Sequence, residues 1–223
     1  MQVGDRSITV GEALEILQRY SERFSDTLRY YDGVVACGRQ PVQSPHHVTM
    51  ADIGRLVIIN ANLMPVDVPR LLAVDARAEF SAVPVDARLE DAAPGSELLA
   101  AAERLYDTFR IGVGIQGAKR SKLLHLKRPL LVPIFDSHVE RVYGPVRDQV
   151  GSYWEATRQD LLSAGNVDAF EEIETEFRKP LREPPRRHLL ALGRLRWLDI
   201  LAWTLGAEGI TAARQEAPVH VPG

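Results

Sequence analysis

Hydrophobic side chains recur at intervals of three and four residues along most of the chain, which is the period of an amphipathic α-helix. A capping box at Thr9 and Glu12 indicates where the first such segment begins. The segments predicted as helices are 14–31, 53–59, 69–74, 96–109, 118–127, 137–143, 152–162, 167–177 and 186–205. The last segment is apolar on most sides, as is typical of a helix buried within a bundle. The pattern therefore predicts an all-α fold.

Three stretches interrupt this periodicity. The turn-rich residues 32–48 separate the first two helices, and residues 82–95 are expected to form a linker. Residues 130–135 are a short apolar run in which Pro133 lacks a backbone donor. We therefore expect this run to be an extended connector rather than a central strand.

The length of 223 residues allows a sizeable core without a metal or disulfide. We expect residues 1–213 to form a single compact helical domain. If it divides into two lobes, residues 1–95 and the C-terminal helix 186–205 would make one lobe, and residues 96–180 the other. Residues 214–223 are expected to be a frayed tail.

The composition excludes several classes of protein. Hydrophobic residues make up 45% of the chain and charged residues 26%, as in ordinary globular proteins. A single cysteine, Cys37, cannot form an internal disulfide or supply a cysteine-based metal site, and His46 and His47 have no carboxylate at metal-binding spacing. We therefore expect no metal and no cofactor. The chain has no apolar run long enough for a membrane span and no export signal, so we expect a cytoplasmic protein.

The net charge of −3 conceals charge blocks. Residues 104–147 hold nine basic and three acidic groups, a net charge of +6, and residues 148–177 hold one and eight, a net charge of −7. An acidic protein binds nucleic acid poorly without a local cluster of cations. The basic block could form such an anion site, or it could simply pair with the acidic helix that follows.

Residues 112–117, Gly-Val-Gly-Ile-Gln-Gly, match the G-x-G-x-x-G dinucleotide fingerprint, and Asp136 lies 19 residues beyond Gly117, near the distance expected for a ribose-binding acid. That fingerprint requires a buried strand before the glycines. Charged residues at helical intervals precede them here, so dinucleotide binding at Gly112–Gly117 is only a lesser alternative.

The same segment is also predicted to be a hairpin between two helices. Gly112, Gly114 and Gly117 would allow the turn backbone to approach a phosphate, and the free amides of the next helix would favour an anion there. Arg120 and Lys122 would add positive charge beside the turn. A hairpin of this kind can bind the backbone of DNA.

The order of hairpin, Lys119 and the segment Ile-Phe-Asp-Ser-His-Val-Glu-Arg-Val at 134–142 resembles the helix-hairpin-helix DNA glycosylases, the endonuclease III and oxoguanine glycosylase superfamily. The resemblance covers about residues 96–145 and implies a two-lobed helical fold. It implies that Asp136 would stabilise positive charge on the sugar and orient or deprotonate the attacking water. It also implies that Lys119 could attack the sugar and add lyase activity.

Over the whole chain the sequence resembles an uncharacterised actinobacterial family known only as a domain of unknown function. The stretches that carry this likeness are 29–32, 121–129, 132–137 and 195–199. This family implies no activity. Asp136 also stands where a helix N-cap would lie, and the lysines could be solvated surface groups.

The sequence therefore leaves two main interpretations open. The first is a non-catalytic DNA- or protein-binding module on a glycosylase-like scaffold, with its protein partner unknown and no membrane association. The alternative is a DNA N-glycosylase that uses Asp136, with Lys119 in a lesser role. In both interpretations, Asp136 and the hairpin face one positively charged cleft.

Overall fold

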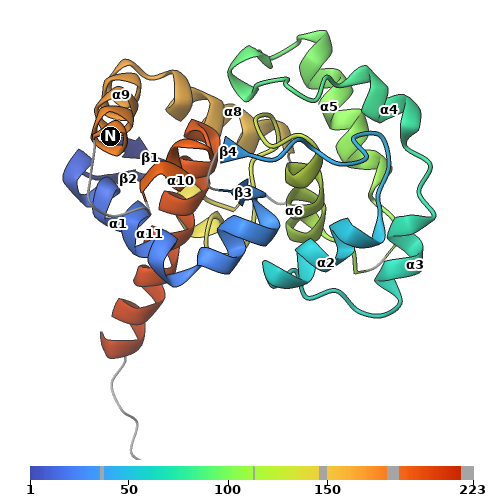
Figure 1. Cartoon of the computed structure of the whole chain (residues 1–223), viewed down its shortest axis with the longest axis horizontal. Coiled ribbons are helices and arrows are strands. Elements are labelled where there is room, and N and C mark those ends of the chain that lie inside the picture. The colour runs from blue at the N-terminus through green and yellow to red at the C-terminus, as the bar shows by residue number, and fades with distance from the viewer. Residues whose placement is uncertain (36–37, 113, 146–149, 180–185, 217–223) are drawn as a thin grey trace, which may run out of the picture.

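The computed structural model describes residues 1–35, 38–112, 114–145, 150–179 and 186–216. Cys37 and the end of the expected tail, 217–223, lie outside the described residues. Helices dominate the described chain, which confirms the all-α class (Figure 1). The two small sheets among the described residues are antiparallel pairs of two-residue strands.

The elements follow one another in this order: β1 Gln2–Val3, β2 Arg6–Ser7, α1 Val10–Arg23, the π-helix η1 Thr27–Tyr31, β3 Val34–Val35, β4 Gly38–Arg39, α2 Met50–Ile58, α3 Asp67–Leu72, α4 Arg77–Ala82, the 3-10 helix η2 Leu89–Asp91, α5 Glu97–Thr108, α6 Gly117–Lys127, α7 Glu140–Tyr143, α8 Val150–Leu162, α9 Ala164–Arg178, α10 Arg186–Leu190 and α11 Arg194–Glu216.

The first helix begins as predicted but ends early. Thr9 Oγ1 accepts a hydrogen bond from the amide of Glu12, and the Glu12 carboxylate accepts one from the amide of Thr9. Helix α1 stops at Arg23, because Phe24 leaves helical geometry and packs edge-on against Trp203 at 5.7 Å. The π-helix η1 then continues the hydrophobic spacing, so the single predicted helix over 14–31 is wrong.

The predicted helix over 186–205 is also two helices. Gly193 has a φ of +80°, which interrupts helical geometry between α10 and α11. The indole of Trp197 donates a hydrogen bond to the carbonyl of Leu189 at 2.7 Å and joins the two pieces. Helix α11 then extends to Glu216, so its backbone is helical at 214–216, where the sequence predicted the start of a frayed tail.

Residues 82–95 do not form the expected linker. Val83, Leu89 and Ala92 are each at most 1% exposed and belong to the core. The amide of Leu89 donates a hydrogen bond to the carbonyl of Leu130 at 2.9 Å. This stretch lacks helical periodicity because its apolar residues fill the core from a 3-10 turn.

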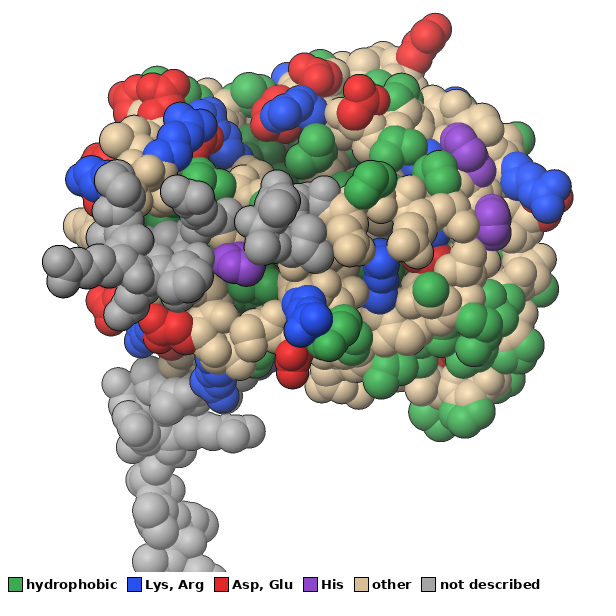
Figure 2. Space-filling view, viewed as in Figure 1, with side chains coloured by type: hydrophobic (Ala, Val, Ile, Leu, Met, Phe, Trp, Pro, Cys, Tyr) green, Lys and Arg blue, Asp and Glu red, His purple; other side chains and the backbone are tan. Residues whose placement is uncertain are grey.

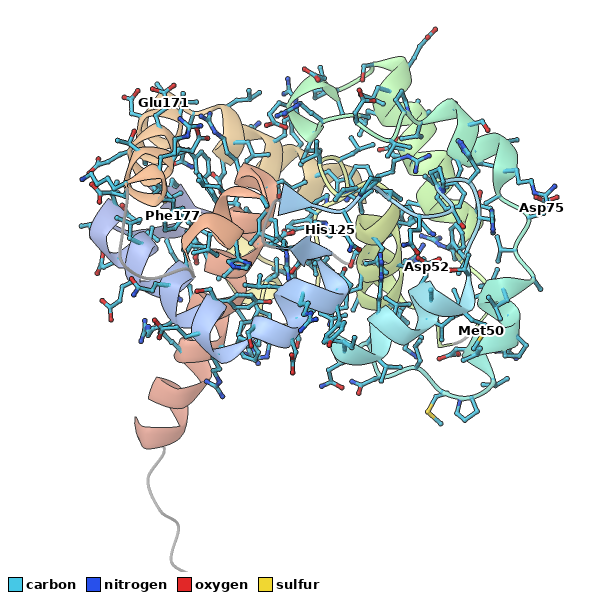
Figure 3. The ribbon with its side chains drawn as sticks, in the orientation of Figure 1. Met50, Asp52, Asp75, His125, Glu171 and Phe177 are labelled. Carbon is cyan, nitrogen blue, oxygen red and sulfur yellow. The ribbon has the colours of Figure 1, made fainter. Side chains whose placement is uncertain are left out.

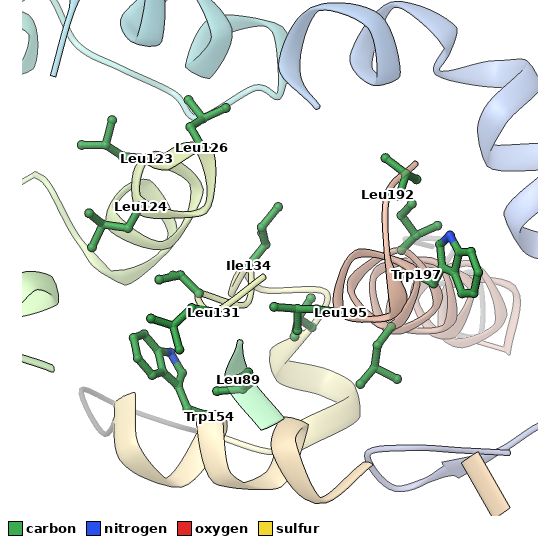
Figure 4. Close-up of a cluster of buried hydrophobic side chains, with 14 of the residues drawn as sticks. Leu89, Leu123, Leu124, Leu126, Leu131, Ile134, Trp154, Leu192, Leu195 and Trp197 are labelled. Carbon is green, nitrogen blue, oxygen red and sulfur yellow. The ribbon is translucent and has the colours of Figure 1, made fainter. Parts of the chain in front are cut away.

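The connector at 130–135 lies in the middle of the core and has neither helix nor strand geometry, as predicted. Leu131 and Ile134 lie between the side chains of α6 and those of α11, with Trp154 of α8 below them (Figure 4). In Figure 1, α2 to α6 lie on one side of the molecule, and α1 and α8 to α11 on the other. The proposed boundaries of the two lobes remain a prediction.

A buried ion pair joins helix α11 to the segment that follows η1. Arg196 of α11 donates to Asp32, which follows η1, at 2.9 and 3.3 Å, and to the hydroxyl of Tyr20 at 3.1 Å. The side chains of Arg196 and Asp32 are 5% and 0% exposed. Burial alone would lower the pKa of Arg196, but the negative charge of Asp32, together with Tyr20 and Asp199, opposes this effect and the pKa is raised.

Removing one partner of this pair should be costly. We predict that Arg196→Met lowers the free energy of unfolding by about 3–5 kcal/mol, because Asp32 would remain buried without its cation. Urea denaturation followed by circular dichroism measures the change. Arg19→Met is the control, because Arg19 is 57% exposed and its removal should cost less than about 1 kcal/mol. Equal effects of the two substitutions would contradict the prediction.

Candidate functional site

The predicted hairpin joins α5 to α6. Gly112 and Gly114 have φ values of +76° and +141°, which favour glycine, and Val113 lies outside the described residues. The hydroxyl of Tyr106 donates to the carbonyl of Gly117 at 3.0 Å and fixes the start of α6. Helix α5 precedes the glycines, so the buried strand that a dinucleotide site requires is missing there.

Helix α6 is buried in the centre of the protein rather than displayed on its surface. Arg120, Lys122, Lys127 and Arg128 are 3%, 8%, 0% and 0% exposed. These four side chains of the basic block therefore point into the protein and do not form the expected positively charged cleft, whereas Arg104, Arg110 and Arg141 of the same block are exposed. The guanidinium of Arg120 stacks on the ring of Tyr106, 4.5 Å from its centroid.

The cations at the end of α6 have internal partners. Lys127 Nζ lies 2.6 Å from Asp52 Oδ2 of α2, and Figure 3 shows Asp52 beside α6. Arg128 donates to the carbonyls of Val83 and Phe80 at 2.7 and 2.5 Å. Burial lowers the pKa of Arg128 to about 10, so the group stays charged at neutral pH. These contacts use the positive charge to bind α2 and α4 to α6.

Lys119 pairs with Asp67 at the start of α3. Its Nζ lies 2.7 Å from Asp67 Oδ2, and the two side chains are 15% and 2% exposed. The hydrogen bond from Lys119 is the largest of the effects that lower the pKa of Asp67. Lys119, the first lysine after the hairpin, is thus held by Asp67, a carboxylate that the sequence pattern does not connect with it.

Asp136 is joined instead to Lys122, one helical turn further along α6. Lys122 Nζ lies 3.6 Å from Asp136 Oδ2, and the side chains are 10% and 13% exposed. Asp136 Oδ1 accepts hydrogen bonds from the amides of His138 and Val139 at 3.0 and 3.3 Å, which caps the turn before α7. Burial lowers the pKa of Lys122, although Asp136 opposes this effect.

Side chains from three helices hold the connector 130–135, which ends just before Asp136. Ser121 Oγ accepts from the amide of Phe135, the hydroxyl of Tyr153 donates to the carbonyl of Ile134, and Asp199 accepts from the amide of Ile134. Burial raises the pKa of Asp199 well above its usual value. The sequence pattern gave no sign of these positioning residues, because each lies on a different helix.

His125 is fully buried and packs as a core residue. Its Nδ1 lies 2.8 Å from the carbonyl of Val132, and its ring stacks on Tyr31 with an interplanar angle of 8°. Figure 3 shows His125 on the inner side of α6. The histidine therefore helps to anchor the connector to the helix.

A second feature of interest is an apolar face formed by η1, α2, α3 and the segment between α2 and α3. Large hydrophobic residues are 37–65% exposed there, and Figure 2 shows hydrophobic side chains at the lower right of the molecule, where Figure 1 places α2 and α3. This apolar face consists of Tyr30, Met50, Val57, Ile58, Met64, Val66 and Leu72. Monomeric proteins rarely leave a large contiguous apolar patch exposed unless it binds something.

The apolar face carries little charge. Among the charged residues between positions 50 and 73, Asp52 and Asp67 are buried in their pairs with lysines of α6, and Arg55 is half-buried. Arg70 is the exposed charged residue of this stretch, and the exposed Arg29 of η1 lies over Tyr30, 5.2 Å from its ring centroid. At the edge of the face, a cavity of about 580 Å³ lies between η1 and the end of α2 and includes Tyr30 and Ile58 in its lining. Asp136 and Lys122 are not among its lining residues.

These observations define a predominantly helical protein that has buried ion pairs in its core and an apolar face on its outside. The chain belongs to DUF6308, a family of unknown function, whose pattern matches residues 13–206. No curated protein and no solved structure matches the chain. Among the described residues, no helix is long and apolar enough to cross a membrane, and no three metal-ligating side chains cluster.

The loop that contains Asp136 leaves no room beside α11. A Cβ added to Gly206 would lie 2.0 Å from the carbonyl oxygen of His138. We predict that Gly206→Ala lowers the free energy of unfolding by about 3 kcal/mol, because backbone must move to relieve the clash.

A matched glycine on another helix gives the control. A Cβ at Gly54 of α2 would meet nothing within 4 Å, so Gly54→Ala should stabilise the protein by up to about 1 kcal/mol. Thermal melting of both variants measures the effects. A neutral Gly206→Ala substitution would show that α11 does not restrain this loop.

Proposed function

We propose that this protein is a non-catalytic binding module that takes another polypeptide on its apolar face. The observation that carries the proposal is the exposure of Met50, Val57 and Met64, which are 62%, 65% and 59% accessible. Leaving such side chains in water is unfavourable, and contact with an apolar partner would recover this free energy.

The distribution of charge favours a polypeptide over DNA as the ligand. Affinity for nucleic acid comes mainly from cations that neutralise phosphates. Arg120 and Lys122 are 3% and 8% exposed, and Lys119 is paired with Asp67. These side chains would have to leave their present contacts to reach a phosphate, whereas the apolar face is already accessible.

The chemistry of the face also suits a polypeptide. Methionine side chains are flexible and polarisable, so they adapt to varied apolar surfaces. The neighbouring cavity of about 580 Å³ lies beside Ile58 and Tyr30, where it could receive an anchoring side chain. Amphipathic helices bind to surfaces of this type through spaced apolar residues.

Selection of peptides from a displayed random library tests this proposal. We expect the wild-type protein to enrich amphipathic sequences and Val57→Lys to weaken their binding at least tenfold. Lysine near the end of α2 suits the helix dipole, so the fold should persist. Leu162→Lys is the matched control, because Leu162 is 45% exposed at the end of α8, outside the face. Failure to enrich any peptide, or equal loss in both variants, would reject the proposal.

The pair of Asp136 and Lys122 favours a second candidate function, base excision from DNA. An amine with a lowered pKa can act as a nucleophile, and Lys122 Nζ lies 3.6 Å from the carboxylate that the glycosylase resemblance singles out. In this candidate, Asp136 would stabilise the sugar cation while Lys122, rather than Lys119, attacks it. Gly112, Gly114 and Gly117 would approach the phosphates, and Arg120 would have to turn outward from Tyr106.

Borohydride trapping on a duplex that contains an abasic site tests this second candidate. The lysine amine would form an imine with the sugar aldehyde and release water, and borohydride would reduce the imine to a stable amine. We expect a covalent adduct with the wild-type protein and loss of the adduct in Lys122→Gln. Lys179→Gln is the control and should have no effect, because it removes a lysine that is 55% exposed just after α9. Absence of both an adduct and base release from damaged duplexes would reject base excision.

A further inference from the structure

We infer that the polypeptide seated on the apolar face is a second copy of this chain, so that the protein forms a two-fold dimer through α2, α3 and η1. This inference rests on the proposed function, because it names the partner of the same apolar face. It is supported by the size of the face and by its shape, and the charged groups around the face limit the arrangement.

The size of the apolar face fits a dimer interface. Its large hydrophobic residues are between 37% and 65% exposed, which corresponds to roughly 700 Å² of accessible surface, somewhat below the ~800 Å² that each partner contributes to a standard interface. In a dimer, the same contacts would bury this surface on both copies.

The charged groups around the face limit how two copies can pair. Arg70 of α3 is exposed, and the exposed Arg29 lies with its guanidinium 5.2 Å from the ring centroid of Tyr30. The cavity lining adds Arg23 and Asp26, one charge of each sign. A two-fold axis places identical surfaces together, so these arginines must lie at the rim of the interface, where Asp26 of the second copy can pair with them.

The face offers both projecting side chains and a hollow. Met50 and Val57 project from α2, and the cavity of about 580 Å³ lies at the end of the same helix beside Ile58. A two-fold arrangement requires one patch to supply both the projecting side chains and the hollow that receives them. A partner with a different surface would need no such combination on this chain.

The mass of the full chain in solution tests the inference. We expect sedimentation and light scattering at 1–100 µM to report about twice the monomer mass of 24.8 kDa. Val57→Lys and, independently, Met64→Lys should shift the protein to the monomer mass, because the dimer would bury two new charges, one from each copy. Leu162→Lys should leave the dimer intact. Circular dichroism checks that each variant is folded.

Each outcome decides a different question. A wild-type monomer at 100 µM, or a dimer that persists in both Val57→Lys and Met64→Lys, overturns the dimer. If that monomer still binds selected peptides in a manner sensitive to Val57→Lys, the proposed function stands and only the second copy is rejected. If the monomer binds no peptide either, both proposals fail together.

Discussion

Burial of the Arg128 guanidinium constrains the structure around it. The group is 0% exposed, and its donors reach the carbonyls of Phe80 and Val83 at the end of α4 and the carbonyl of Pro45 in the loop before α2. A buried cation without such partners would cost several kcal/mol, so these segments must close over the end of α6 before the core is stable. The pair of Lys127 and Asp52 beside it imposes the same requirement on α2.

The hydrophobic period revealed the helical class and the position of most helices, since that information is local. It did not reveal where helices break. Phe24 and Gly193 end helical geometry through an aromatic contact and a positive φ, while the apolar spacing continues past both. Residues 82–95 had the composition of a linker, because their burial depends on contacts with the distant connector.

The candidate site could be predicted only in part. The local sequence points to Asp136 and to its capping position, because both follow from nearby residues. It does not point to Lys122 as the partner of Asp136, because Lys119 and Lys122 lie one helical turn apart and the sequence does not distinguish them. Asp67 of α3 binds the first lysine and leaves the second beside Asp136. A similar limit applies to the basic block, since charged residues usually mark a solvated surface, whereas Arg120, Lys122, Lys127 and Arg128 are buried here.

Helix α2 carries two sets of residues, one packed in the core and the other exposed to solvent. Asp52, Ile53 and Leu56 are held by the core, whereas Met50 and Val57 are free of it. Within the family, the inner set should therefore tolerate little divergence, while the outer set can drift. Relatives could in this way acquire different binding preferences over evolutionary time without redesigning the scaffold that supports them.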